Sequence, residues 1–117
     1  MTIKVAIIGA GSIGFTRRLM RDILSVPELI DSEFSFHDID KENLKMIAEL
    51  ARRDISANKL PAKLSTTTNR LRALDGADYV INTTRIGGLD AFSLDVDIPL
   101  KYGVDQFIEI GPGKVLS

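Results

Sequence analysis

The segment "KVAIIGAGSIGF", residues 4–15, constrains the fold more than any other part of the chain. Residues 3–8 form a short, almost entirely apolar run, which is typical of a strand buried on both faces of a parallel sheet. Three glycines follow within six residues, although glycine loses more conformational freedom on folding than other residues and adds no side chain to pack. We infer that the glycines are needed for the backbone conformation and close approach that they allow, which indicates a bound ligand.

The rest of the sequence alternates between strand-like and helix-like segments. Apolar residues at spacings of three and four predict helices, and short alternating or continuous apolar runs predict strands. The predicted helices cover residues 13–24, 40–59 and 69–74, and the predicted strands cover residues 3–8, 33–39, 62–67 and 77–84. Asp40 stands where the N-cap of the second helix is expected, and Pro27 follows the end of the first.

This alternation predicts an α/β fold, a Rossmann-like doubly wound parallel sheet, because crossovers between parallel strands are right-handed. We expect the strand order 3-2-1-4-5, in which residues 105–110 supply the fifth strand, and the sheet is truncated relative to larger members of this class. Residues 85–103 contain two adjacent glycines and a proline and are expected to form a loop and a partial helix. With no linker or repeat, residues 1–117 are expected to form one dinucleotide-binding domain.

Composition excludes several classes of partner. The chain of 117 residues has 15 Lys and Arg against 16 Asp and Glu, so its net charge of -1 offers no electrostatic argument for nucleic acid or an anionic membrane. No apolar run approaches the roughly 18 residues that span a bilayer. The N-terminus does not resemble a signal peptide, so a cytoplasmic location is expected. An uncovered sheet edge leaves self-association into a homo-oligomer open.

The glycines fit a dinucleotide-binding motif. Gly9, Gly11 and Gly14 match G-x-G-x-x-G between a strand and a helix, where they allow a tight turn, close approach to a pyrophosphate, and close helix-to-strand packing. The free N–H groups of the first helical turn favour an anion. Asp38 ends the second strand, where a carboxylate binds the adenosine ribose, whereas Asp40 has an alternative role as a helix cap. An acid there favours NAD over NADP.

For several other polar residues, both a functional and a structural role are considered. Asn82 and Thr83 end the fourth strand at the carboxyl edge of the sheet, where they are candidates for cofactor contact, although threonine is also a common strand residue. His37 is interpreted as structural, since no second metal ligand lies near it in sequence. The arginines at 17, 18 and 21 fit either phosphate steering or a solvated helix face with an Arg18 to Asp22 pair.

Four segments in order, "IIGAGSIGFTRRLMRDIL", "HDID", "GADYVINTTRIGG" and "DIPLKYGVDQ", resemble the N-terminal part of glycoside hydrolase family 4, over about residues 3–106. The members of that family are α-galactosidases, α-glucosidases and 6-phosphoglycosidases that depend on NAD and a divalent metal such as Mn²⁺. The resemblance therefore implies that this chain is part of an enzyme of this kind. In that family NAD takes a hydride from sugar C3, a base removes the C2 proton, the glycosidic oxygen leaves, and the hydride is returned after water adds.

The resemblance also implies roles for individual residues. Gly9, Gly11 and Ser12 would hold the pyrophosphate, Asp38 the ribose, Asn82 with Thr83 the nicotinamide side, and Arg85, Gly87 and Gly88 would approach cofactor or substrate. Phe92 replaces the second arginine typical of the phosphoglycosidases, which favours an unphosphorylated α-galactoside or a related substrate.

The chain also departs from the family. It has no cysteine to bind the metal, and His37 is not at the position of the family's metal histidine, which lies beyond residue 117, as does the catalytic base. We therefore expect NAD binding without hydrolysis, and no catalytic or metal-binding residue in this chain. The last dozen residues resemble instead the C-terminal strand of malonyl-CoA:acyl-carrier-protein transacylases, or are simply an apolar strand with a "GPG" turn.

Two other functions share the predicted fold. One is an oxidoreductase of the malate or lactate dehydrogenase type, and the other is a non-catalytic nucleotide-sensing module. The segment "IPLKYGVDQ" favours the glycosidase, because neither rival requires it after the fourth strand. Fold alone does not separate the three.

Overall fold

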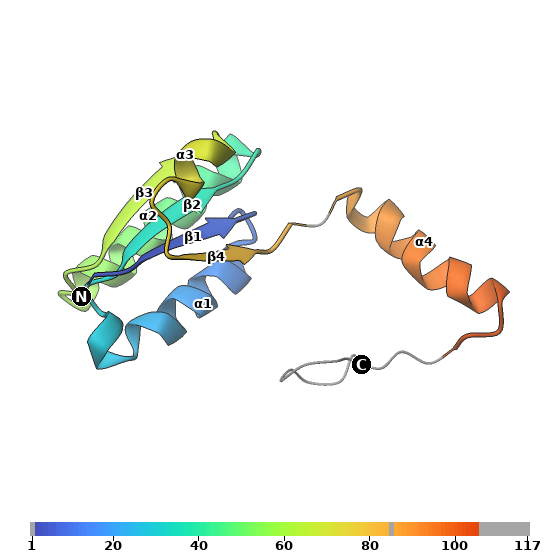
Figure 1. Cartoon of the computed structure of the whole chain (residues 1–117), viewed down its shortest axis with the longest axis horizontal. Coiled ribbons are helices and arrows are strands. Elements are labelled where there is room, and N and C mark those ends of the chain that lie inside the picture. The colour runs from blue at the N-terminus through green and yellow to red at the C-terminus, as the bar shows by residue number, and fades with distance from the viewer. Residues whose placement is uncertain (1, 85, 106–117) are drawn as a thin grey trace. The chain divides into compact units, whose positions relative to one another are not determined.

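The computed structural model describes residues 2–84 and 86–105, and the chain divides after Thr84 into two compact units that are described separately here (Figure 1). The first unit contains β1 (Lys4–Ile8), α1 (Ile13–Leu24), the short 3-10 helix η1 (Pro27–Leu29), β2 (Glu33–His37), α2 (Lys41–Ala57), β3 (Lys63–Thr67), α3 (Arg70–Leu74) and β4 (Tyr79–Asn82). The second unit contains α4 (Gly88–Lys101).

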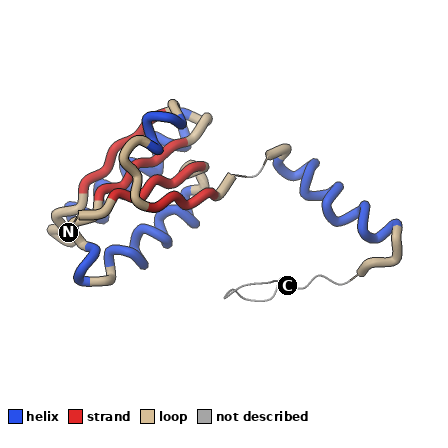
Figure 2. Tube along the Cα trace, viewed as in Figure 1, coloured by secondary structure: helices blue, strands red, loops and turns tan. Residues whose placement is uncertain are grey.

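The four strands form one parallel sheet in the order β3-β2-β1-β4, which confirms the predicted order of these strands (Figure 2). The chain moves from β1 to β3 through α1 and α2, then returns across the sheet to β4 through α3. Because crossovers are right-handed, this reversal puts α3 on the face opposite to α1 and α2. The predicted fifth strand, residues 105–110, lies outside the described residues apart from Asp105.

The main core lies between the sheet and the pair α1 and α2. Paired residues of neighbouring parallel strands point to the same face, so Val5 faces α1 and α2 with Phe34, and Ile7 does so with Phe36. The two phenylalanine rings meet edge to face with their centroids 6.4 Å apart. The helices contribute the buried side chains of Met20, Leu24, Leu44, Ile47 and Ala51. This layer fixes the helices that flank the glycine loop.

Apolar residues at spacings of three and four in the segment 13–24 predict a buried face of α1 that includes Phe15, and at this position the prediction is wrong. Phe15 is 49% exposed, whereas Thr16 is fully buried. The Thr16 hydroxyl donates a 2.8 Å hydrogen bond to the carbonyl of Ala10, so its polar atom is satisfied inside the core. The face of α1 that packs on the core therefore differs slightly from the predicted one. It contains the hydrogen-bonded hydroxyl of Thr16 in place of the aromatic ring of Phe15.

The second unit contains more helix than predicted. The sequence predicts a loop and a partial helix over residues 85–103, but α4 is a continuous helix of 14 residues. Its helix-breaking residues stand at its ends: Gly87, with φ +84°, is the N-cap, and Pro99 lies in the last turn. Gly87 suits the N-cap because glycine adopts a positive φ without strain, and Pro99 removes a single intrahelical hydrogen bond close to the end of the helix. Within the described residues, no helix is long and apolar enough to cross a membrane.

The C-terminus of α2 ends in an unusual backbone conformation. Lys59 has φ +51°. Its amide donates a hydrogen bond to the carbonyl of Ser56, and the amide of Leu60 donates one to the carbonyl of Ile55. These two bonds form a Schellman motif, in which the left-handed position normally carries glycine. A side chain there is strained.

Lys59→Gly is expected to raise the free energy of unfolding by about 0.5–1 kcal/mol, because glycine adopts this conformation without steric cost. Chemical denaturation of the chain measures the change. Lys59→Ala removes the same long side chain but keeps the Cβ atom, so it serves as the control. Equal effects of the two substitutions would contradict the assignment of strain to the backbone.

An ion pair joins α1 to α2. Arg17 donates two hydrogen bonds to Asp54, of 2.7 and 2.9 Å, and Arg21 lies 3.7 Å from the same carboxylate. The predicted pair of Arg18 with Asp22 is wrong, since these side chains form no ion pair among the described residues. The hydrogen bond from Arg17 lowers the pKa of Asp54 below its ordinary value of 3.8, against the opposing effect of burial.

The contribution of Asp54 to stability is expected to depend on pH. A depressed pKa in the folded state means that the stabilisation is present above pH 3.8 and is lost as the pH falls through the folded-state pKa. Asp54→Asn is therefore expected to lower the thermal midpoint at pH 7, and its difference from wild type is expected to shrink progressively as the pH falls below 3.8. Asp22→Asn, a change at an exposed acid of α1, is the control. A difference between wild type and Asp54→Asn that does not depend on pH would contradict this assignment.

Candidate functional site

The glycine loop joins β1 to α1 at the carboxyl edge of the sheet. Its first glycine, Gly9, has φ +87°, a conformation that side chains rarely adopt. The amides of Gly9 and Ala10 both donate to the carbonyl of His37, each at 2.9 Å. The last residue of β2 thus holds the loop in a tight turn at the end of the neighbouring strand.

The other neighbouring strand holds the same loop through Thr83. The Thr83 hydroxyl lies 3.1 Å from the carbonyl of Ile8 and 3.0 Å from that of Gly9, and the Thr83 amide donates to Ile8 at 2.8 Å. A Cβ atom on Gly9 would lie 3.0 Å from both the carbonyl carbon and the hydroxyl oxygen of Thr83. Glycine is therefore required for close approach as well as for conformation, and the Thr83 hydroxyl is committed to the loop.

Asp38 lies directly against the loop. Its Oδ2 atom accepts a 2.7 Å hydrogen bond from the amide of Gly11, and its Oδ1 atom accepts one of 2.9 Å from the amide of Asp40. A Cβ atom on Gly11 would lie 2.6 Å from Oδ2. The absence of a side chain at Gly11 thus admits the carboxylate, which is oriented by two amides and retains lone pairs for further donors.

The N-terminus of α1 has no acceptor from its own cap. Ser12 is the N-cap, but its side chain makes no capping hydrogen bond, and the first turn contains no acidic residue. By contrast, Asp40 caps α2 and Asn69 caps α3 through their side chains. Together with the helix dipole, the amides that begin α1 form a site suited to an anion.

Gly14 differs from its predicted role in packing. It is exposed, and a Cβ atom built on it would meet nothing within 4 Å. The prediction that this glycine serves close helix-to-strand packing is therefore wrong. What the structure leaves at Gly14 is open space beside the first turn of α1.

The end of β4 is polar and locally bonded. Asn82 is exposed, and its Oδ1 atom accepts hydrogen bonds from the amide and the hydroxyl of Thr84, at 3.1 and 2.8 Å. Its side-chain nitrogen donates to no atom of the described residues. Arg85 lies outside the described residues, and the glycines at 87 and 88 belong to the second unit, so they are not placed relative to the loop.

His37 fits the structural reading. It is 7% exposed, its Nε2 atom lies 3.2 Å from the carbonyl of Thr68, and its Nδ1 atom has no hydrogen-bond partner among the described residues. Over residues 2–84 and 86–105, no group of three or more His, Cys, Asp or Glu side chains is arranged to hold a metal ion. The chain also lacks cysteine, so its described residues do not fit the metal site of the resembled family.

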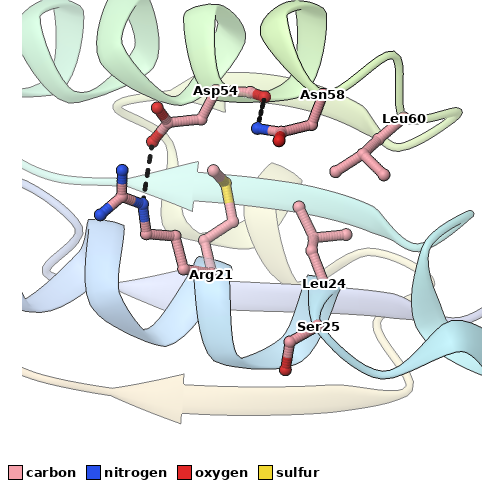
Figure 3. A pocket seen from close by; sticks show the side chains of 7 residues that line it. Arg21, Leu24, Ser25, Asp54, Asn58 and Leu60 are labelled. Carbon is pink, nitrogen blue, oxygen red and sulfur yellow. Dashed lines mark hydrogen bonds and ion pairs between the residues drawn. The ribbon is translucent and has the colours of Figure 1, made fainter.

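Two open hollows lie away from the glycine loop. The larger, of about 330 Å³, lies between the C-terminal parts of α1 and α2, where Arg21 and Asp54 form its charged wall and Leu24 and Leu60 contribute apolar surface (Figure 3). The smaller, of about 240 Å³, lies along α2 beside Thr66. Neither is lined by a predicted cofactor residue. The candidate site is thus an open edge defined by donors and acceptors rather than by an enclosed volume.

Comparison with known proteins gives one consistent family. The model of a family described as family 4 glycosyl hydrolase matches residues 4–117. An α-galactosidase of Rhizobium meliloti (strain 1021) is 55% identical over 105 residues, which are 90% of this chain and 21% of that protein. The chain spans about a fifth to a quarter of the length of the curated relatives it matches.

Solved structures that are similar to this chain are also glycosidases. A 6-phospho-β-glucosidase of Thermotoga maritima, determined with NAD and glucose-6-phosphate, is 33% identical with a TM-score of 0.73 over 88% of this chain and 24% of that one. A 6-phospho-α-glucosidase from gut microorganisms, in complex with NAD and Mn²⁺, is 26% identical with a TM-score of 0.72 over 88% of this chain and 24% of that one.

The family match runs to residue 117 and so includes the last dozen residues, which lie outside the described part of the structure. The likeness of that segment to a transacylase strand stays a prediction. The parallel sheet, the glycine loop between β1 and α1 and the family match over nearly the whole chain lead to one conclusion: this chain belongs to family 4 of the glycosyl hydrolases.

Proposed function

We propose that this chain binds NAD at the glycine loop, as the dinucleotide-binding part of a family 4 glycosidase that acts on α-galactosides. The observation that carries the proposal is the arrangement around Gly11. An oriented carboxylate, Asp38, and the uncapped amides of α1 lie side by side at the carboxyl edge of the sheet. A dinucleotide offers the matching groups, since it contains a ribose diol next to a pyrophosphate.

Each half of the arrangement would bind one part of the cofactor. The amides of the first turn of α1, which begins after Ser12 beside the open space at Gly14, would hold the pyrophosphate. The two oxygens of Asp38 would accept hydrogen bonds from the ribose hydroxyls. Asn82 and Thr83 stay predictions for the nicotinamide side, and Arg85 stays a prediction for an approach to cofactor or substrate. For Thr83 the structure supports an indirect role through the loop.

The substrate class rests on one finding and one expectation. The relative that is 55% identical is an α-galactosidase. The resemblance also implies that Phe92 replaces an arginine typical of the phosphoglycosidases. When bound, NAD supplies hydride transfer at the sugar, while the residues of this chain bind and orient the dinucleotide. Manganese accompanies NAD in two similar structures, but the described residues of this chain offer no site for it. A cytoplasmic location and self-association remain proposals from the sequence.

The first experiment tests the cofactor. NAD is expected to raise the thermal midpoint of the chain in proportion to the logarithm of its free concentration above the dissociation constant. Asp38→Ala removes both oxygens that would accept the ribose hydroxyls, so the affinity for NAD is expected to fall by about tenfold to a hundredfold. NADP is expected to bind more weakly than NAD, because the carboxylate repels a 2′-phosphate.

Calorimetric titration of both dinucleotides provides the dissociation constants, and Asp31→Ala, a change at an acid before β2 and so at the opposite edge of the sheet, is the control. If neither dinucleotide shifts the midpoint, the proposed cofactor is wrong.

The second experiment tests the indirect role of Thr83. Thr83→Val keeps the branched shape but removes the hydroxyl from the carbonyls of Ile8 and Gly9, so we expect a loss of about 1 kcal/mol in stability and a weaker affinity for NAD. Thr83→Ser retains the hydroxyl and should restore the affinity. Thr84→Val, which changes a hydroxyl bonded to Asn82, is the matched control. Thr83→Val with unchanged NAD affinity, or Thr83→Ser without rescue, would contradict the assignment.

A further inference from the structure

Thr16 is the polar residue that α1 buries. Its side chain is fully covered, and its hydroxyl donates a 2.8 Å hydrogen bond to the carbonyl of Ala10, which lies six residues earlier. Ala10 is also fully buried, so water does not replace this donor at the carbonyl. A buried hydroxyl that is bonded to a carbonyl is ordinary core structure, and these facts alone assign no function. What distinguishes Thr16 is the peptide unit that it holds.

The peptide between Ala10 and Gly11 is hydrogen-bonded at both of its ends. Its carbonyl accepts from the hydroxyl of Thr16, and its amide donates to Oδ2 of Asp38 at 2.7 Å. The peptide is planar and trans, so its carbonyl and its amide point in opposite directions. The hydroxyl inside the core and the carboxylate at the edge of the sheet therefore hold one rigid plane from its two sides.

The glycine at position 11 explains why this peptide needs a donor on its carbonyl side. A Cβ atom on Gly11 would lie 2.6 Å from Oδ2 of Asp38, so the carboxylate excludes a side chain there. Without a Cβ atom the backbone at Gly11 adopts a wide range of φ, and the preceding peptide rotates at low steric cost. A rotated peptide would turn the carbonyl of Ala10 toward the carboxylate, although both groups only accept hydrogen bonds. The bond from Thr16 disfavours that rotation, because the carbonyl would lose its buried donor.

We propose that Thr16 is a positioning residue for Asp38, whose hydroxyl acts through the 10–11 peptide to keep the carboxylate directed at the ribose hydroxyls of a dinucleotide. The inference rests on the proposed binding of NAD and extends it to the origin of the selectivity for the ribose. Thr16 itself does not touch the ligand, since its side chain is fully covered. Loss of its hydroxyl therefore affects the ribose contact selectively, whereas the uncapped amides of α1 remain available to the pyrophosphate.

The test compares NAD with an NAD analogue whose adenosine ribose lacks the 2′-hydroxyl, by calorimetric titration below the thermal midpoint of each variant. Wild type is expected to bind NAD about tenfold more tightly than the analogue, because the analogue lacks one donor to Asp38. In Thr16→Val, which keeps the branched shape, this preference is expected to fall to about twofold, and Thr16→Ser, which keeps the hydroxyl, should restore it. A general loss of stability weakens both ligands by the same factor and leaves the ratio unchanged.

Ser32→Ala is the matched control. The hydroxyl of Ser32 also belongs to a fully buried residue and donates to a carbonyl, that of Leu29, but it lies before β2 at the opposite edge of the sheet. This change is expected to lower the thermal midpoint without altering the preference for the 2′-hydroxyl. A double-mutant cycle gives a second measurement, because in an Asp38→Ala background Thr16→Val is expected to have no further effect on the affinity for NAD.

Two results would overturn the role of Thr16 and leave the cofactor assignment in place. One is a wild type that binds NAD while either it shows no preference for the 2′-hydroxyl or Thr16→Val keeps the full preference. The other is a loss of NAD affinity in Thr16→Val that is equal with and without Asp38. If wild type binds neither dinucleotide, both proposals are overturned. Should Thr16→Val not fold, Thr16→Ala, which has no second methyl group to accommodate, provides the same comparison.

Discussion

The glycine loop is held from both sides by the strands that flank β1, and the candidate site depends on this arrangement. On one side the carbonyl of His37 accepts two amides of the loop, and on the other the hydroxyl of Thr83 reaches two of its carbonyls. Both contacts require that β2 and β4 pair with β1 in parallel and end at the same edge. The order of the sheet therefore decides the shape of the loop, and the loop decides which amides remain free.

Those free amides carry a cost in stability that a ligand would offset. An N-cap side chain commonly contributes about 1 kcal/mol, and α2 and α3 both use one, whereas the side chain of Ser12 does not cap α1. The helix nevertheless forms, because its other end is buried through Met20 and Leu24 and its middle is joined to α2 by Arg17. Tertiary contacts thus stabilise a helix whose first turn stays available to an anion.

The sequence predicted the parts of this arrangement that repeat along the chain. Apolar periodicity located the strands and helices of the first unit, and right-handed crossovers then led to the order 3-2-1-4. Asp40 was recognisable as a cap from its position before an apolar helix, and its side chain accepts the amide of Asn43. The glycine motif predicted a tight turn at Gly9, because only a residue without a side chain tolerates its backbone.

What escaped prediction depends on contacts between segments distant in the sequence. Thr16 contains a hydroxyl and was passed over for the core, yet the carbonyl of Ala10 satisfies it. The approach of Asp38 to Gly11 joins residues 27 apart, so periodicity carries no signal for it. For α4, local glycine and proline suggested a break, but Gly87 is the N-cap and Pro99 lies in the last turn, so the helix runs between them. The helix propensity of a residue type does not show whether that residue stands inside a helix or at its end.

The same geometry explains why a single carboxylate can serve two purposes. Each oxygen of Asp38 accepts one backbone amide, and these bonds fix the orientation of the group without neutralising its charge. A carboxylate oxygen accepts more than one hydrogen bond, so the ones that orient Asp38 do not exhaust its capacity for a ligand diol. Because the orienting donors come from the glycine loop and from the start of α2, the acid is already in place before a ligand arrives. A group that is oriented in advance loses little conformational freedom on binding, and so one of the costs of an ordered polar contact is reduced.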